Sequence, residues 1–67
     1  MQYRLTYNSM MIYRKNTMLS EDGSIYRINW SAKRNCKWSD GILFTEEEKE
    51  YMLKHYRFVG VYEIYEV

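Results

Sequence analysis

The clearest structural signal in the sequence is a helix start at residues 44–48. Thr45 has the side chain of an N-cap residue, and Glu48 follows three positions later as its capping-box partner. Glutamates in the first turn and basic residues near the last turn both suit the helix dipole. We expect a helix from about Thr45 to Tyr56. Its apolar stripe is narrow, as is typical of one helix lying on a sheet, and contains Tyr51, Met52, His55 and Tyr56, with Glu48 one turn earlier.

The first half of the chain alternates between apolar and polar residues, which predicts β-strands. Residues 2–7 alternate in this way, and Asn8-Ser9 can turn the chain into the following segment MMIYRK. Asp22-Gly23 is a strong signal for a two-residue hairpin turn. Such a turn pairs Leu19 with Tyr26, Thr17 with Ile28 and Lys15 with Trp30. One face of the predicted sheet then contains Tyr13, Leu19, Tyr26, Ile28 and Trp30.

Two features of this sheet stay open. Pairing across Asn8-Ser9 sets Leu5 beside Ile12, on the face opposite Tyr13, so either a bulge near Asn16 corrects the register or both faces are partly covered. After the helix, residues 58–67 (FVGVYEIYEV) predict a final strand that is apolar on both faces. That pattern fits an interior strand, or an edge strand covered by a second subunit, and the position of this strand in the sheet is open.

The predicted fold class is α+β, with a small antiparallel sheet built from a three-strand meander, then one helix packed on one face, then a final strand. A chain of 67 residues is at most one domain, spanning 1–67. A domain this short buries only about 60% of its unfolded surface. With a single cysteine and no cluster of metal ligands, it must rely on dense aromatic packing or on a partner subunit, so a homo-oligomer is one option.

Cellular location and origin are predicted from composition. The N-terminus lacks the continuous apolar core of a signal peptide, and no run of residues reaches membrane-spanning length. One lone cysteine, Cys36, favours a reducing compartment, so we expect a cytoplasmic protein without membrane contact. The chain has no proline, a single alanine and many residues of AT-rich codons, in the style of a small gene of a low-GC bacterium or its phages.

Charge is distributed unevenly along the chain. Residues 1–38 contain seven basic and two acidic residues, a net charge of +5, whereas residues 39–67 contain three basic and seven acidic residues, a net charge of −4. Such asymmetry bears on the choice of partner rather than on the fold. It allows a basic face for a polyanion, an acidic face for a basic protein, or head-to-tail self-association.

The sequence offers no catalytic set, and we expect no catalytic residue, no metal and no cofactor. His55 is the only histidine and lies among basic residues at the helix end, where the dipole or packing accounts for it. The helix-start glutamates are accounted for by capping. The three glycines are isolated, so there is no phosphate-binding loop. Cys36 lies in a basic segment that would favour its thiolate, but no second reactive group accompanies it, and we interpret it as an incidental thiol.

The segment WSAKRNCKWSD, residues 30–40, combines basic and aromatic side chains. We interpret Trp30 as a core residue of its strand. Three alternatives stay open for the rest: a solvated loop, a protein contact, or a surface for single-stranded nucleic acid, which combines cations with stacking aromatics. The residues predicted to contact a partner are Arg27, Lys33, Arg34, Lys37 and Trp38.

These observations predict a small non-catalytic binding protein. The leading hypothesis is a phage or mobile-element inhibitor that occupies a surface of a larger host protein, for example a defence nuclease such as a CRISPR effector. The main alternative is a nucleic-acid-binding module that uses the basic N-terminal half. A third hypothesis is a self-assembling protein.

Overall fold

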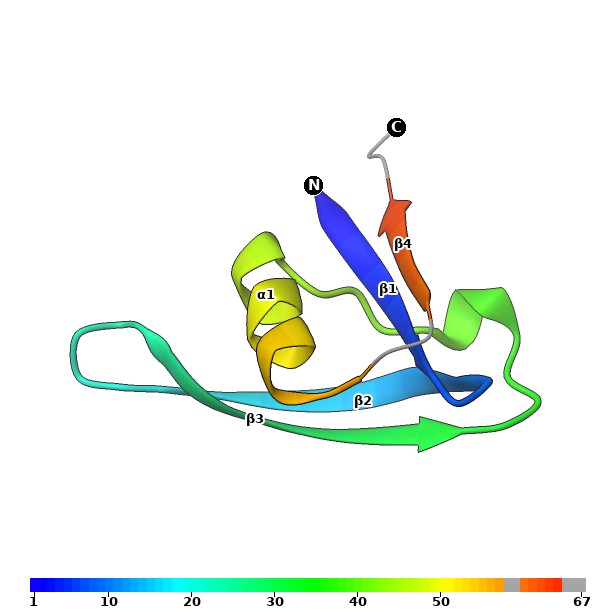
Figure 1. Ribbon diagram of the computed structural model, residues 1–67, viewed down its shortest axis with the longest axis horizontal. Helices are drawn as coiled ribbons and strands as arrows, with labels where there is room; N and C mark the ends of the chain where they lie inside the picture. Colours follow the sequence, from blue (N-terminus) through cyan, green and yellow to red (C-terminus); the bar gives the residue numbers. More distant parts are fainter. Residues whose placement is uncertain (58–59, 65–67) are drawn as a thin grey trace.

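The computed structural model describes residues 1–57 and 60–64, with side chains described through residue 57 and at Gly60. It contains four strands, β1 (Gln2–Tyr7), β2 (Met10–Leu19), β3 (Ile25–Lys33) and β4 (Gly60–Ile64), one α-helix, α1 (Glu46–His55), and a short 3-10 helix, η1 (Trp38–Asp40). The strands form one antiparallel sheet in the order β3-β2-β1-β4, and α1 lies across one face of it (Figure 1). The predicted α+β fold, with a meander, a helix and a final strand, is confirmed.

The position of the final strand is now determined. β4 pairs antiparallel with β1, from Gln2 opposite Ile64 to Thr6 opposite Gly60, and stands at the edge of the sheet. β1 is therefore an interior strand, although it comes first in the sequence. Of the predicted final strand, residues 58–59 and 65–67 lie outside the described residues, and so do the side chains of residues 61–64.

The helix begins and ends close to the predicted residues. Thr45 is the N-cap: its hydroxyl oxygen accepts a hydrogen bond from the Glu48 backbone N–H at 3.2 Å, and its own N–H donates to Glu48 Oε1 at 2.9 Å. The capping box is thus confirmed. At the other end, Tyr56 leaves the helical conformation while its N–H still donates to the Met52 carbonyl at 2.8 Å. The buried side of the helix consists of Met52 and Glu48.

Glu48 is the one charged residue among the buried side chains of the described region, with 6% of its surface exposed. Besides capping the helix, its carboxylate accepts hydrogen bonds from the Lys15 ammonium and the Thr17 hydroxyl, both on β2. Burial is the largest single influence and raises the pKa of Glu48. The hydrogen bonds from Lys15, Thr17 and Thr45, together with the charge of Lys15, outweigh it, so the pKa lies below its ordinary value. Glu48 therefore joins the helix to the sheet as an anion.

Two bulges shape the long hairpin formed by β2 and β3. The predicted pairs Thr17–Ile28 and Lys15–Trp30 are present. Between Ile12 and Arg14 the register shifts, because β2 has one extra residue, Tyr13, opposite β3. This bulge sets Ile12 on the same face as Ile28, so a bulge, as one of the two alternatives predicted, corrects the register of β2. The bulge is at Tyr13, three residues before Asn16, near which the sequence predicted it.

The second bulge corrects part of the predicted core face. Leu19 pairs with Ile25 rather than with Tyr26, because Tyr26 is an extra residue of β3 that has no partner on β2. The loop is also longer than two residues and is closed by Ser20 and Ser24, whose backbones bond at 2.8 Å. Leu19 and Tyr26 are 58% and 57% exposed, so their predicted place in the core is wrong. Ile25 packs on the core in their place.

β1 and β2 separate soon after their turn, and Phe44 fills the gap between them. Asn8 and Ser9 form that turn with φ values of 47° and 64°, and the only pairs between the strands are Thr6–Met11 and Tyr7–Met10. Further along, Phe44 and Tyr3 bond each other's backbone at 2.9 and 2.7 Å, and Ile42 N–H donates to Ile12 at 3.0 Å. The fully buried Phe44 thereby centres a core completed by Tyr3, Leu5, Ile12, Ile28 and Met52.

The buried ion pair predicts a specific dependence of stability on pH. Because folding lowers the pKa of Glu48, its contribution is fully present above the unfolded pKa and is lost as pH falls through the folded value. Glu48→Gln should lower the free energy of unfolding at pH 7 by about 1–3 kcal/mol, since the partly buried Lys15 ammonium loses its anionic partner. The difference between variant and wild type should shrink as pH falls below the ordinary value of 4.5.

Urea unfolding across this pH range measures both effects. The matched control is Glu47→Gln, which removes the same charge from an exposed neighbour and should change stability by no more than about 0.5 kcal/mol. Equal effects of the two substitutions at neutral pH would show that Glu48 is not the residue that joins helix and sheet.

Candidate binding surface

The two faces of the β2–β3 hairpin differ sharply in what they present. The side chains of Lys15, Thr17, Ile28, Trp30 and Ala32 lie on the face toward α1, as strand alternation and the contact of Lys15 with Glu48 show. Their neighbours form the opposite face, here called the open face, which comprises Tyr13, Arg14, Asn16, Met18, Arg27, Asn29, Ser31 and Lys33. These eight described residues include three exposed cations and no carboxylate.

Tyr13 holds two of the cations of the open face. The guanidinium carbon of Arg14 lies 5.3 Å from the centre of the Tyr13 ring, and the Lys33 ammonium lies 5.0 Å from it. Cation–π attraction at these distances restrains both side chains without neutralising them. The bulge at Tyr13 therefore organises the positive charge at one end of the open face.

The predicted contact residues fall into two groups. Lys33, Arg34 and Lys37 are exposed at the end of β3 and in the loop that follows it, and Lys37 directly precedes η1. Arg27 is also exposed, but it lies six residues from Lys33 along β3, about 20 Å in an extended strand. It donates from Nε to Asn29 Oδ1 at 3.1 Å. The structure thus sets Arg27 on the open face with Lys33, yet apart from the loop.

Trp38 borders the open face without being buried. It is 46% exposed, and the Arg4 guanidinium carbon lies 5.2 Å from its ring centre. Arg4 also donates to the Gly41 carbonyl at 3.2 Å. Arg4 alternates with the buried Tyr3 and Leu5, so η1 packs on the side of the sheet away from α1. Lys37 and Trp38 therefore lie on the same side of the sheet as the open face.

Sequence reasoning missed Arg14 and Tyr13 as parts of this surface. Arg14 alternates with Lys15, whose partner Trp30 was correctly assigned to the core face, so strand alternation alone could have placed Arg14 on the opposite face. Tyr13 contacts Lys33 beside the bulge, which sets the consecutive residues Tyr13 and Arg14 on the same side of the sheet. No signal in the sequence fixes the position of that bulge.

The residues considered for chemistry do not meet one another. The Cys36 thiol donates a hydrogen bond to the Lys33 carbonyl at 3.6 Å and is partly buried. His55 is exposed at the helix end, with its ring 4.4 Å from that of Tyr51. Within residues 1–57 and 60–64 no group of three His, Cys, Asp or Glu side chains could hold a metal ion. The expectation of a non-enzyme stays a prediction.

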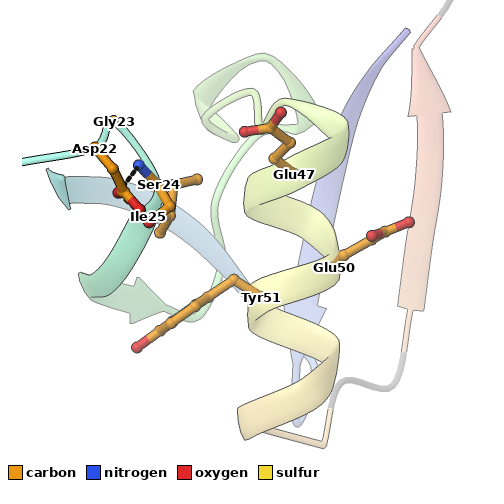
Figure 2. A pocket seen from close by; sticks show the side chains of 7 residues that line it. All are labelled: Asp22, Gly23, Ser24, Ile25, Glu47, Glu50 and Tyr51. Atoms are coloured by element: carbon orange, nitrogen blue, oxygen red, sulfur yellow. Dashed lines mark hydrogen bonds between the residues drawn. The ribbon is translucent and has the colours of Figure 1, made fainter. Parts of the chain in front are cut away.

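Negative charge gathers on the other side of the molecule. A hollow of about 470 Å³ lies between the hairpin loop and α1 and is lined by the acidic residues Asp22, Glu47 and Glu50 together with Gly23, Ser24, Ile25 and Tyr51. Figure 2 shows the loop facing the helix across this hollow, with Glu50 pointing away from the loop. The acids that line this hollow thus lie away from the open face, whereas Asp40 lies in η1 on the border of that face.

Asp22 fixes the conformation of the hairpin loop. Its carboxylate accepts hydrogen bonds from the Ser20 hydroxyl, from the Ser24 hydroxyl at 2.6 Å and from the Ser24 backbone N–H at 3.0 Å. Those bonds, led by the one from Ser20, lower the pKa of Asp22 to about 2. Gly23 follows with φ 86°, a conformation that glycine adopts without strain.

Comparison with known proteins gave no match: no family model, no curated protein and no solved structure is significantly similar to the chain. Among the described residues, no helix has the length and apolar character needed to cross a bilayer. The function therefore has to be inferred from the surface itself.

The loop geometry predicts a measurable pKa. In a carbon-detected NMR titration, the Asp22 carboxyl should titrate near pH 2, and the combined substitution Ser20→Ala with Ser24→Ala should raise its midpoint toward the ordinary value of 3.8. Ser39→Ala, at an exposed serine outside the loop, should leave the midpoint unchanged. A midpoint near 3.8 in the wild-type chain would contradict the hydrogen-bonded loop.

Proposed function

We propose that the chain is a small non-catalytic binding protein that presses its open face against an acidic surface of a larger protein. The observation that carries the proposal is the absence of any carboxylate among the described residues of the open face, next to three exposed cations. Lys37 and Trp38 extend the contact along its border. The mechanism is steric, with charge complementarity orienting the two proteins and raising the rate of their association.

The size of the molecule supports a single docking surface. The chain exposes 4989 Å² in total, and a standard protein interface takes about 800 Å² from each partner. About a sixth of the surface would therefore be covered, which the face of one long hairpin and its bordering loop can supply. Arginine and tryptophan, both present here, are enriched at the energetic centres of protein interfaces.

The occupied aromatic rings favour a protein partner over single-stranded nucleic acid. Nucleic-acid surfaces of that kind need open aromatic faces on which bases stack. Here Arg14 and Lys33 lie over Tyr13, and Arg4 lies over Trp38. A phosphate backbone remains the second candidate partner, because the row of cations along β3 suits it equally well.

The composition supports a particular setting for such a protein. A short chain rich in residues of AT-rich codons fits a phage or mobile-element gene, and small proteins of that origin can inhibit larger host proteins by covering a surface. The proposed target is a host defence nuclease, such as a CRISPR effector. The cytoplasm is the corresponding location.

Charge reversal on the open face tests the proposal. The tagged chain captures its partner from the source organism, and binding of the purified partner is then measured by surface plasmon resonance. Arg27→Glu combined with Lys33→Glu should weaken binding by at least about tenfold and slow association, since both cations face the acidic surface. The matched control, Lys54→Glu with Arg57→Glu, makes the same change of charge on the helix side and should bind like wild type.

Two results would contradict the proposal. One is a loss of binding in the helix-side variant while the open-face variant still binds. The other is saturable, strongly salt-dependent binding of DNA or RNA in a fluorescence anisotropy titration at physiological ionic strength, which would assign the open face to the second candidate. A further variant, Lys33→Glu with Arg34→Glu, tests whether the loop after β3 contributes separately.

A further inference from the structure

The middle of the open face contains a hollow of about 250 Å³, lined by Arg14, Lys15, Asn16, Asn29, Trp30 and Ser31. These residues are three successive cross-strand pairs: Arg14–Ser31, Lys15–Trp30 and Asn16–Asn29. The side chains of the central pair point toward α1, where Lys15 contacts Glu48 and Trp30 contacts Tyr56. The backbone of that pair therefore forms the floor, and the outer four side chains form the walls.

The walls present hydrogen-bond donors around one positive charge. Arg14 supplies a planar guanidinium, held in place over Tyr13. Asn29 accepts from Arg27 with its carbonyl oxygen, which leaves its amino group as the part of the amide directed away from Arg27. Asn16 and Ser31 add an amide and a hydroxyl. Each of the four wall residues can donate a hydrogen bond to an anion, and none of them carries a negative charge.

The bulge gives this hollow its shape. Bulges bend a strand and redirect a side chain, and they are frequent beside functional sites. The extra residue Tyr13 directly precedes Arg14, opposite Ser31. Because the bulge brings Tyr13 and Arg14 to the same side, the ring supports the guanidinium at the rim of the hollow.

We propose that this hollow is the seat for a carboxylate side chain, Asp or Glu, of the acidic partner protein, with Arg14 as its main ligand. The inference rests on the proposed function and names the chemistry recognised at the centre of the docking surface. A guanidinium matches a carboxylate in geometry, because two parallel N–H groups meet two oxygens. One cation matches one negative charge. The small neutral neighbours Asn16, Asn29 and Ser31 leave room for the carboxylate and satisfy its remaining lone pairs.

Binding of a carboxylate to the hollow can be tested on the free chain, without its partner. A capped hexaglutamate peptide is titrated into the isotope-labelled chain, and amide chemical shifts are followed by NMR. Saturable shifts should centre on residues 14–16 and 29–31. Arg14→Gln should weaken peptide binding by about tenfold, the value expected for loss of a charge-assisted hydrogen bond. Asn29→Asp, which changes one atom of an exposed side chain, should abolish it by repulsion.

A control variant removes one positive charge, as Arg14→Gln does, at a position away from the hollow. Lys54→Gln removes one exposed cation from α1, away from the open face, and should change peptide affinity by less than about twofold. The thermal unfolding midpoint of each variant is measured alongside. Equal losses in Arg14→Gln and Lys54→Gln would overturn the inference, because the attraction would then depend only on the net charge of the chain. Shifts outside the hollow, or a hollow filled by a DNA oligonucleotide and not by the peptide, would overturn it too.

The proposed function is judged separately from this seat. If the peptide leaves the hollow empty while the Arg27→Glu, Lys33→Glu variant still loses the captured partner, the open face is a docking surface and the carboxylate seat is wrong. If that variant also keeps the partner, both proposals fail.

Discussion

A single buried carboxylate connects the helix to the sheet. Glu48 caps its own helix through Thr45 and accepts hydrogen bonds from Lys15 and Thr17 on β2. Burying a carboxylate is costly unless its partners are fully provided, and here both strand and helix provide them. The contact fixes α1 against one side of the hairpin. It also takes the one lysine in the middle of β2 to that side, so the cations that remain on the other side have no helix carboxylate beside them.

The separation of charge follows from this arrangement. Glu47 and Glu50 of α1 line the hollow beside the hairpin loop, on the same side as Asp22. Arg14, Arg27 and Lys33 lie on the opposite side of the sheet, where the described residues offer them an aromatic ring and an amide but no carboxylate. A nearly neutral chain therefore has one strongly basic face, which its net charge of +1 conceals. The proposed contact with a partner depends on that face.

The parts of the fold that could be predicted are those with local causes. The capping box of Thr45 and Glu48 involves residues three positions apart, and the pairing of Thr17 with Ile28 follows from a nearby turn. Phe44 filling the gap beside Tyr3 and β4 joining the edge of β1 both depend on residues far apart in sequence. Glu48 was expected in the narrow stripe of the helix, but its partners on β2 were not, because no local pattern links residues 15 and 48.

The same division holds for the binding surface. Lys33, Lys37 and Trp38 were predicted from a basic, aromatic segment, and the structure sets them on one side of the sheet. The distance of Arg27 from the loop follows from the length of β3, and the inclusion of Arg14 follows from alternation once the pairing is known. The hollow beside Arg14, in the middle of the open face, depends on the bulge at Tyr13. A bulge adds one residue to a strand without a distinctive sequence pattern, so its position had to come from the structure.

The two sides of the β2–β3 hairpin differ in role: α1 stabilises one side, and we propose that a partner covers the other. Lysine acetylation of the chain, free and in complex with its captured partner, followed by mass spectrometry, tests this most directly. Lys33 and Lys37 are exposed on or beside the open face, and Lys54 is exposed on the helix. The partner should protect Lys33 and Lys37 from acetylation and leave Lys54 reactive. Protection of Lys54, with Lys33 and Lys37 still reactive, would contradict the proposal.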